Sequence, residues 1–377
     1  MLLRARLGLG AKPCDWVKLY GELQDAREIG SGRFPKNINL EEDTIDWRQG
    51  WFELANYKEF PLGLKVGRQE LSYGDERLIG SFDWNNAGRV FDAIKLRYQA
   101  KKFWIDAFAA DVVNNNVLSG RDNSFDDKAD WADDFYGLYG RTTAVTNHVW
   151  DLYALFRDKA DAKFLGAQRQ IYTLGTRFEA TPSLAPWDYF VEVAGQFGHV
   201  QTAGAWLDHR AFAGVISTGY TFNQDWKPRV GVEYNYASGD GNPKDGTDET
   251  FDNLFPTNHK FYGYMDIFAW KNIHNPRLTL SCQPHKTVKI QFDAHAFWLD
   301  DNQDAWYRAN GNAVRRDISG HAGSYVGSEL DLTVNYTPHK RVKVQAGYSH
   351  FFSGDFVRDT GPHSDADFVY TQLTLSL

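Results

Sequence analysis

The chain has 377 residues with 41 basic and 49 acidic side chains, so its formal net charge is −8 at pH 7. This acidic balance argues against nucleic acid as the main partner, because phosphate binding normally needs a basic surface. No stretch of about 20 mostly apolar residues occurs, which excludes a membrane-spanning helix. A transmembrane β-barrel stays compatible with this composition, since each of its strands needs only one apolar face.

Apolar and polar residues alternate with a period of two in segments of about ten residues. Val342 and Val344, for example, alternate with Lys343 and Gln345. A period of two places one set of side chains on each face of a β-strand. No linker or helical period interrupts the pattern, so we predict a single all-β domain over residues 1–377. The predicted strands lie near residues 2–10, 16–26, 43–55, 62–71, 88–98, 102–113, 132–142, 148–157, 168–179, 187–200, 208–222, 228–238, 276–283, 287–300, 323–337, 341–352 and 367–377.

The connections between these segments alternate in length. Short ones such as 99–101 and 284–286 carry turn residues, whereas long ones such as 27–42 and 72–87 are rich in Gly, Asp and Asn. This asymmetry is typical of an antiparallel up-and-down β-barrel that spans the bacterial outer membrane many times, with short turns in the periplasm and long loops outside. Outer-membrane lipid and lipopolysaccharide are therefore expected partners. Aromatic residues near strand ends fit interfacial belts: Trp51, Trp150, Tyr189, Tyr236, Phe352 and Tyr370.

The number of predicted strands is odd, whereas bacterial single-chain barrels have an even number. The first connection is short and the last one is long, so the first and last strands run in the same direction. Either the first strand is missing together with its leader, or a strand is hidden in the stretch 239–275. We expect the first explanation, because a single strand added within 239–275 would put all later connections out of phase.

Several stretches resemble the alginate export family of outer-membrane porins. They are Leu64-Lys65-Val66-Gly67-Arg68-Gln69-Glu70-Leu71, Asp83-Trp84-Asn85 with Arg89-Val90-Phe91-Asp92, Phe255-Pro256-Thr257-Asn258-His259 through Gly263-Tyr264-Met265-Asp266, and Glu329-Leu330-Asp331-Leu332. The resemblance implies an 18-stranded barrel whose pore is lined by basic residues and passes an anionic polysaccharide. The family's first strand and leader have no counterpart here, which agrees with the odd strand number.

If the apolar face meets lipid, the polar face lines the interior of the barrel. The main pore-lining candidates are Lys65, Arg89, Lys95, Arg97, Arg157, Arg169, Arg177, Arg229, Lys289, Lys343, Asp293, Glu329 and Asp331. Further inward candidates are Arg6, Lys18, Lys102, Glu22, Asp106, Asp151, Asp188, Glu192 and Glu233. Basic residues outnumber acidic ones in this set although the whole chain is acidic, so positive charge is expected to concentrate inside. Arg89, Lys95 and Arg97 stand out as three cations on one face of one predicted strand.

Inward Arg and Lys side chains attract anions, and Arg binds carboxylates bidentately. We therefore predict an anion-selective porin that passes an anionic saccharide by passive diffusion, either an alginate-like uronate polymer or a small anionic solute. Periplasmic export or uptake partners are compatible with that role. The alternatives are a non-selective porin or one with another substrate, a barrel enzyme, and a soluble β-helical carbohydrate-binding protein. No nucleophile elbow, zinc-protease motif, Walker motif or Rossmann motif occurs, so an enzyme is not expected.

The loop at residues 239–249 contains oxygen ligands that could hold Ca²⁺. It lacks the EF-hand spacing, because Lys244 stands where a ligand is needed. An ordinary solvated loop is the preferred interpretation, and no cofactor is predicted. This loop or the segment 27–42 could instead fold into the lumen as a gate.

Overall fold

The computed structural model describes residues 1–30, 42–113, 125, 129–160, 168–202 and 204–377. All seventeen predicted segments are strands, and each pairs antiparallel with the next in one continuous sheet. The strands are β1 (Leu2–Cys14), β2 (Val17–Glu28), β3 (Asp43–Ala55), β4 (Leu62–Gln69), β5 (Phe91–Gln99), β6 (Phe103–Val113), β7 (Ala129–Thr142), β8 (His148–Lys159), β9 (Arg169–Ala180), β10 (Trp187–Thr202), β11 (Ala205–Thr221), β12 (Arg229–Ala237), β14 (Ile273–His285), β15 (Val288–Trp298), β18 (Tyr325–His339), β19 (Val342–Ser353) and β20 (Ala366–Leu375).

Smaller elements complete the fold. The two-residue strand β13 (Thr247–Asp248) pairs in parallel with β11 and brings the sheet to 18 strands. A separate pair is formed by β16 (Ala305–Tyr307) and β17 (Ala313–Arg316). The helices are the 3-10 turn η1 (Pro182–Leu184) and α1 (Asp355–Thr360). Within the described part of the chain, no helix is long and apolar enough to cross a membrane.

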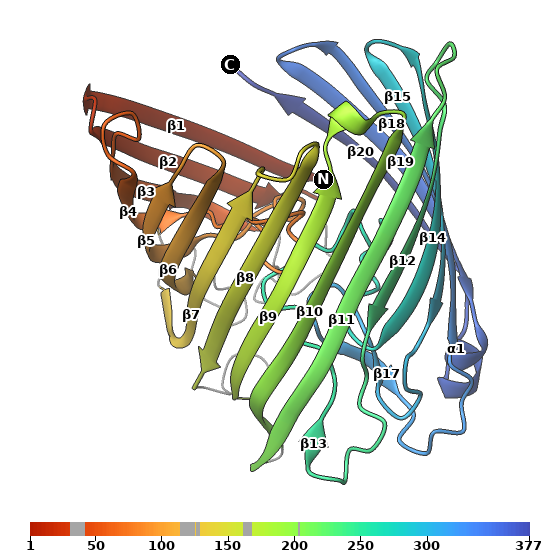
Figure 1. The fold of residues 1–377 in the computed structure, drawn as a ribbon. Helices are drawn as coiled ribbons and strands as arrows, with labels where there is room; N and C mark the ends of the chain where they lie inside the picture. Colours follow the sequence, from red (N-terminus) through yellow and green to blue (C-terminus); the bar gives the residue numbers. More distant parts are fainter. Residues whose placement is uncertain (31–41, 114–124, 126–128, 161–167, 203) are drawn as a thin grey trace.

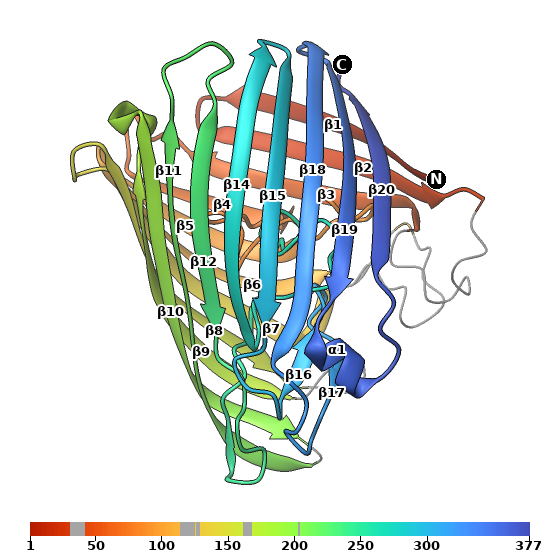
Figure 2. The same cartoon turned by 90° about the vertical axis from the view of Figure 1, so that its right-hand side faces the viewer.

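The sheet curls around an interior, which we call the lumen (Figures 1 and 2). Its apolar face points outward, as β5 shows. Ile94 is 57% exposed and Leu96 is 44% exposed, whereas the alternate residues Lys95 and Arg97 point to the lumen. This arrangement inverts that of a water-soluble β-protein, and it suits a wall that meets lipid on the outside.

The connections follow the predicted rhythm with one exception. The prediction of a long connection between β10 and β11 is wrong, because Thr202 pairs directly with Ala205. These two strands extend as a hairpin beyond their neighbours, as Figure 1 shows. The stretch 239–275 contains β13 and the first three residues of β14. The strand β13 does not reverse the chain between β12 and β14, which pair antiparallel. The later connections therefore keep their alternation.

The outermost strands of the meander, β1 and β20, run in the same direction, as the odd number of long strands requires. No backbone pairing joins β1 to β20 among the residues that the structure describes.

Two long connections fold into the lumen, namely 70–90 between β4 and β5 and 238–272 between β12 and β14. They pair there: Ile79 and Phe255 form a parallel bridge, and the Thr257 N–H donates to the Glu76 carbonyl at 2.8 Å. The ring of Phe255 packs against the wall. The apolar core therefore lies inside the curve of the sheet and holds both connections in place.

Candidate pore and its charged wall

Paired Arg and Asp side chains line the lumen near the short-turn end of β5 to β8. Arg97 donates through Nε and Nη2 to the two oxygens of Asp106 at 2.6 and 2.7 Å. Arg141 binds Asp151 in the same way, with both distances 2.7 Å. Each pair is directly opposite in register, which places the two side chains on the same face of the sheet. Both carboxylates are fully buried. Each one binds Nε and Nη2 of its arginine and so fixes the guanidinium group. The Nη1 atoms form no hydrogen bond with the described residues.

Arg157 and Arg169 attach the connection 238–272 to the wall. Arg157 on β8 donates to both oxygens of Asp133 at 2.7 and 2.6 Å. Its Nη1 lies 3.6 Å from Oδ1 of Asp252, and Arg169 on β9 binds the other oxygen of Asp252. Lys159 lies 3.5 Å from Asp133. Two arginines of the wall, Arg157 and Arg169, thus hold the same acidic residue of the connection, Asp252.

An arginine of the wall, Arg177, and an arginine of the connection itself, Arg77, attach the connection 70–90. Arg177 on β9 donates to Glu179 at 2.6 Å and to Asp75 of the connection at 2.7 Å. Arg77 of the connection donates to Glu233 on β12 at 3.0 Å. Both guanidinium groups are almost completely buried. The connection therefore spans from β4 and β5 to the far wall.

The prediction that Arg89 shares a strand with Lys95 and Arg97 is wrong. The strand β5 begins at Phe91, because the chain turns at Gly88, whose φ is 76°. Arg89 instead donates to the carbonyl of Gly80 at 3.1 Å and to that of Pro256 at 3.0 Å. Burial and the nearby Arg157 lower the pKa of Arg89 to about 10, so it stays protonated at neutral pH. It joins the two inward connections to each other.

The remaining cations of the predicted set lie on β12, β15 and β19. Arg229 binds both oxygens of Asp188. It also lines a polar pocket of about 210 Å³ together with Glu233 and Arg277. Lys289 and Lys343 are exposed on their strands, and no ion pair involves them within the described part of the chain.

The three acidic residues among the main candidates, Asp293, Glu329 and Asp331, lie on β15 and β18 and are buried. Asp293 accepts hydrogen bonds from Arg277 at 2.9 Å and from the Thr279 hydroxyl at 2.6 Å. Glu329 accepts the Met265 N–H at 3.0 Å, which ties the connection 238–272 to this side of the wall as well.

Sequence reasoning missed five arginines of this network. Arg48, Arg68, Arg141 and Arg277 lie within predicted strands, and their positions in the alternation were the signal that could have found them. Arg77 lies in a connection and carried no such signal. The structure also adds acidic partners, including Asp92 for Arg68, Asp133 for Arg157, and Glu70 for Arg48. Carboxylates that the predicted set lacked thus compensate several of the inward cations.

Comparison with protein families identifies the family of the chain. Residues 3–371 match the family model described as alginate export. The chain belongs to the alginate export family. It is a β-barrel porin of the bacterial outer membrane and a non-enzymatic channel.

Solved structures agree with this porin in fold. Pseudomonas aeruginosa OccD3 (OpdP) has a TM-score of 0.60 and 13% identity, covering 100% of this chain and 87% of that one. Acinetobacter baumannii OccAB4 has a TM-score of 0.61 and 12% identity, covering 99% and 91%. Pseudomonas aeruginosa OpdK, solved with vanillate, has a TM-score of 0.61 and 13% identity, covering 99% and 90%. No curated protein matches the porin in sequence.

Aromatic side chains of the porin divide between the two faces of the wall. Trp150 and Phe352 are exposed on the outer face, as an interfacial belt requires. The prediction is wrong for Trp51 and Tyr370. Trp51 lies under the ammonium group of Lys65, and Tyr370 accepts a hydrogen bond from Gln345 and contacts Trp84. Their positions in the alternation place both rings inside.

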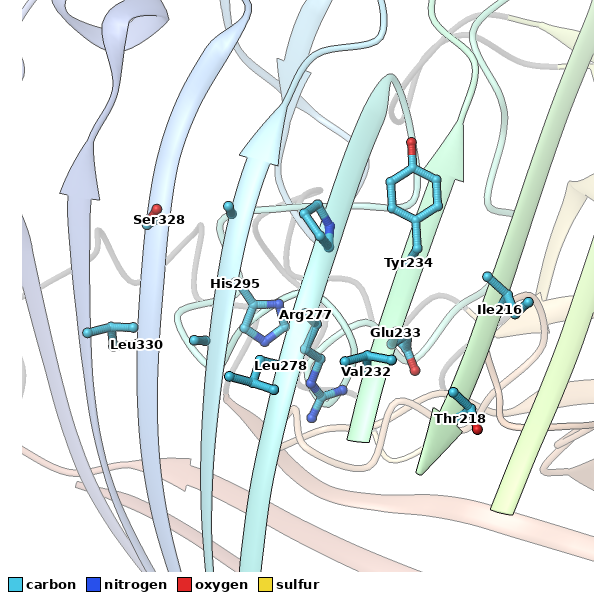
Figure 3. A pocket seen from close by; sticks show the side chains of 13 residues that line it. Ile216, Thr218, Val232, Glu233, Tyr234, Arg277, Leu278, His295, Ser328 and Leu330 are labelled. Atoms are coloured by element: carbon cyan, nitrogen blue, oxygen red, sulfur yellow. The ribbon is translucent and has the colours of Figure 1, made fainter. Parts of the chain in front are cut away.

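The outer wall of the porin has an apolar groove of about 690 Å³ over β11, β12, β14, β15 and β18 (Figure 3). Small residues leave this hollow between larger ones: Ala294 and Ala296 lie beside Leu278 and Leu330. The groove belongs to the lipid-facing surface and not to the lumen.

The loop 239–249 of the porin is tied to neighbouring loops. The N–H of Gly239 donates to Asp300, and that of Asp240 donates to Asp304. Burial raises the pKa of Asp240 to about 6. Across the residues that the structure describes, no group of three or more His, Cys, Asp or Glu side chains is arranged to hold a metal ion.

Proposed function

We propose that this porin passes carboxylate anions by passive diffusion, with a uronate saccharide or a small organic acid as the solute. The observation that carries the proposal is the side-on pairing of Arg97 with Asp106 and of Arg141 with Asp151. Each carboxylate uses Nε and Nη2 and leaves Nη1 available, while the side chains stay 29% and 32% exposed. A fixed guanidinium with a free donor can bind a passing carboxylate without losing side-chain entropy.

The inward connections favour short solutes over a long polymer. The connection 70–90 reaches β12 through Arg77, and the connection 238–272 reaches β8 and β9 through Asp252. Both cross the lumen and pair with each other. A small solute can pass beside such segments in their docked positions, whereas a stiff polymer needs a continuous wide path. OpdK, similar in fold, was solved with vanillate, a small carboxylate.

A non-selective porin is the second candidate. The near balance of paired charges supports it, because Arg157, Arg177 and Arg229 each bind carboxylates that offset their charge. The two candidates differ in ion selectivity.

Reversal potentials of the full-length chain in planar bilayers, under a gradient of potassium chloride, test the proposal. We expect anion selectivity, and it should weaken in the variant Arg97→Gln/Arg141→Gln. The control is Arg341→Gln, which removes an exposed cation from the turn between β18 and β19 at the same end. A cation-selective wild type contradicts the proposal, and an unselective one supports the second candidate.

A further inference from the structure

Two lysines face each other across neighbouring strands of the lumen wall. Lys65 on β4 and Lys95 on β5 are direct partners in the antiparallel register. Directly opposite residues have Cβ atoms about 5 Å apart, and like charges in these positions destabilise the pair of strands. Both side chains point to the lumen, since their neighbours Leu64, Ile94 and Leu96 belong to the outer face. An arrangement with this cost needs an anion to offset it.

The nearby carboxylates are already engaged. Asp106 accepts two hydrogen bonds from Arg97 and a third from the Tyr73 hydroxyl at 2.8 Å. The ammonium nitrogen of Lys95 lies 3.7 Å from Asp106, which is too far for a hydrogen bond. On the other side, Glu53 binds Lys18 at 2.8 Å.

Neither Lys65 nor Lys95 therefore has a hydrogen-bonded carboxylate among the residues that the structure describes. This part of the wall has four cations, Lys18, Lys65, Lys95 and Arg97, but only two carboxylates of the described residues form ion pairs with them. Glu53 binds Lys18, and Asp106 binds Arg97 and lies 3.7 Å from Lys95.

An aromatic ring holds Lys65 in place of a carboxylate. Its ammonium nitrogen lies 3.8 Å from the centroid of the Trp51 ring. Tyr20 stacks on Trp51 with ring centroids 5.3 Å apart and fixes the indole. A cation–π contact positions an ammonium group but does not neutralise it. Lys65 thus lies at a fixed place in the lumen with no hydrogen-bonded carboxylate among the described residues, unlike the arginines that carboxylates compensate.

We propose that Lys65 and Lys95 form a binding subsite for one carboxylate group. The two oxygens of a carboxylate can each accept a hydrogen bond from one ammonium group, and the charge of the anion offsets the repulsion between the lysines. Arg97, two residues farther along β5 on the same face, offers its free Nη1 as the next donor toward the short-turn end. The inference rests on the proposed function, since it identifies where in the lumen the solute binds.

Block of the chloride current by added glucuronate tests the subsite in single channels of the full chain. We expect Lys65→Gln and Lys95→Gln each to raise the half-blocking concentration of glucuronate about tenfold, the effect of losing one charge-assisted hydrogen bond. Lys65→Arg should retain the block. Lys101→Gln is the matched control, because it removes an exposed charge from the turn between β5 and β6.

Acetate and glucose define which part of a ligand is recognised. Block by acetate that also depends on Lys65 indicates a site for any carboxylate, whereas dependence for glucuronate alone indicates a uronate site; both outcomes support the subsite. Glucose should not block. Half-blocking concentrations that stay unchanged in Lys65→Gln and Lys95→Gln overturn the subsite even if the wild type is anion-selective. A cation-selective wild type would instead overturn the proposed function. Heat-modifiable migration on gels verifies that each variant folds.

Discussion

Arg77 in the connection between β4 and β5 donates from Nη2 to Oε1 of Glu233 on β12 at 3.0 Å, although 156 residues separate the two in sequence. The Arg77 side chain is only 1% exposed. The same guanidinium lies 3.9 Å from the centroid of the Phe261 ring and donates to Asn235 at 2.9 Å. A buried cation of the connection thus fixes it to the opposite wall, in addition to the contact of Asp75 with Arg177.

Replacing Arg77 with Gln should release the connection 70–90. Removal of one partner from a buried ion pair costs about 3–5 kcal/mol, because it leaves the other charge buried and uncompensated. Here that charge is Glu233, which is 9% exposed. We expect a larger and noisier single-channel conductance and faster proteolysis within 70–90.

The double variant Arg77→Met/Glu233→Met separates the ion pair from packing. Replacing both charges by apolar side chains of similar volume is often close to neutral. The single-channel current of the double variant should therefore show less noise than that of Arg77→Gln alone. Equal noise in both variants would mean that the uncompensated charge of Glu233 is not what disturbs the connection.

Replacing Asp252 with Asn should increase anion preference. Asp252 offsets part of the charge of Arg157 and Arg169, and Asn has the same shape without the charge. We expect the ratio of anion to cation permeability to rise about threefold, equivalent to ~0.7 kcal/mol. Reversal potentials give this ratio. Asp225→Asn, in the exposed turn between β11 and β12, removes the same charge at the other end and should leave the ratio unchanged.

Strands were predictable from the sequence because a period of two is a local signal. In β5, the alternation of Ile94 and Leu96 with Lys95 and Arg97 alone determines which face meets lipid and which meets the lumen. The alternation was less informative at strand ends. Arg89 continues the polar phase of β5 in sequence, yet the turn at Gly88 places it outside the strand.

Partners of the charged residues were not predictable, because they depend on contacts between distant segments. Asp252 meets Arg169 only because the connection 238–272 folds inward. Asp133 lies in the predicted strand 132–142, and nothing in its neighbourhood indicates that Arg157 would bind it bidentately. A count of inward residues consequently left out carboxylates that compensate part of the positive charge.

Lys271 should make anion selectivity depend on pH. Burial and the nearby Arg169 lower its pKa to about 8, with Asp248 and Asp304 acting in the opposite direction. Lys271 therefore loses its charge as the pH rises through about 8, and anion preference should fall between about pH 7 and 9. Reversal potentials at these pH values should change less in Lys271→Gln than in the wild type. An equal change in both would assign the titration to another group.

The same shift fixes the sign of a stability effect. The pKa of Lys271 lies below its ordinary value of 10.5, so between about pH 8 and that value the unfolded chain binds more protons than the folded chain. The contribution of Lys271 to stability should thus increase with pH across this window. In Lys271→Gln, the unfolding temperature should lack this part of the pH dependence.

Gly67 on β4 should not tolerate a side chain. Its φ is 121°, and a Cβ atom there would overlap the carbonyl oxygen of Gly50 and lie 2.9 Å from the Cα of Trp51 on β3. Backbone atoms in a paired strand cannot move aside, so Gly67→Ala should cost about 2 kcal/mol or more. The matched control is Gly195 on β10, where an added Cβ meets nothing within 4 Å. Gly195→Ala should be neutral or stabilising by about 0.4–1 kcal/mol, because alanine restricts the unfolded chain. The temperature at which gel migration changes from the folded to the unfolded form measures both effects, and an equal temperature for the two variants would show that the strain at Gly67 does not limit stability.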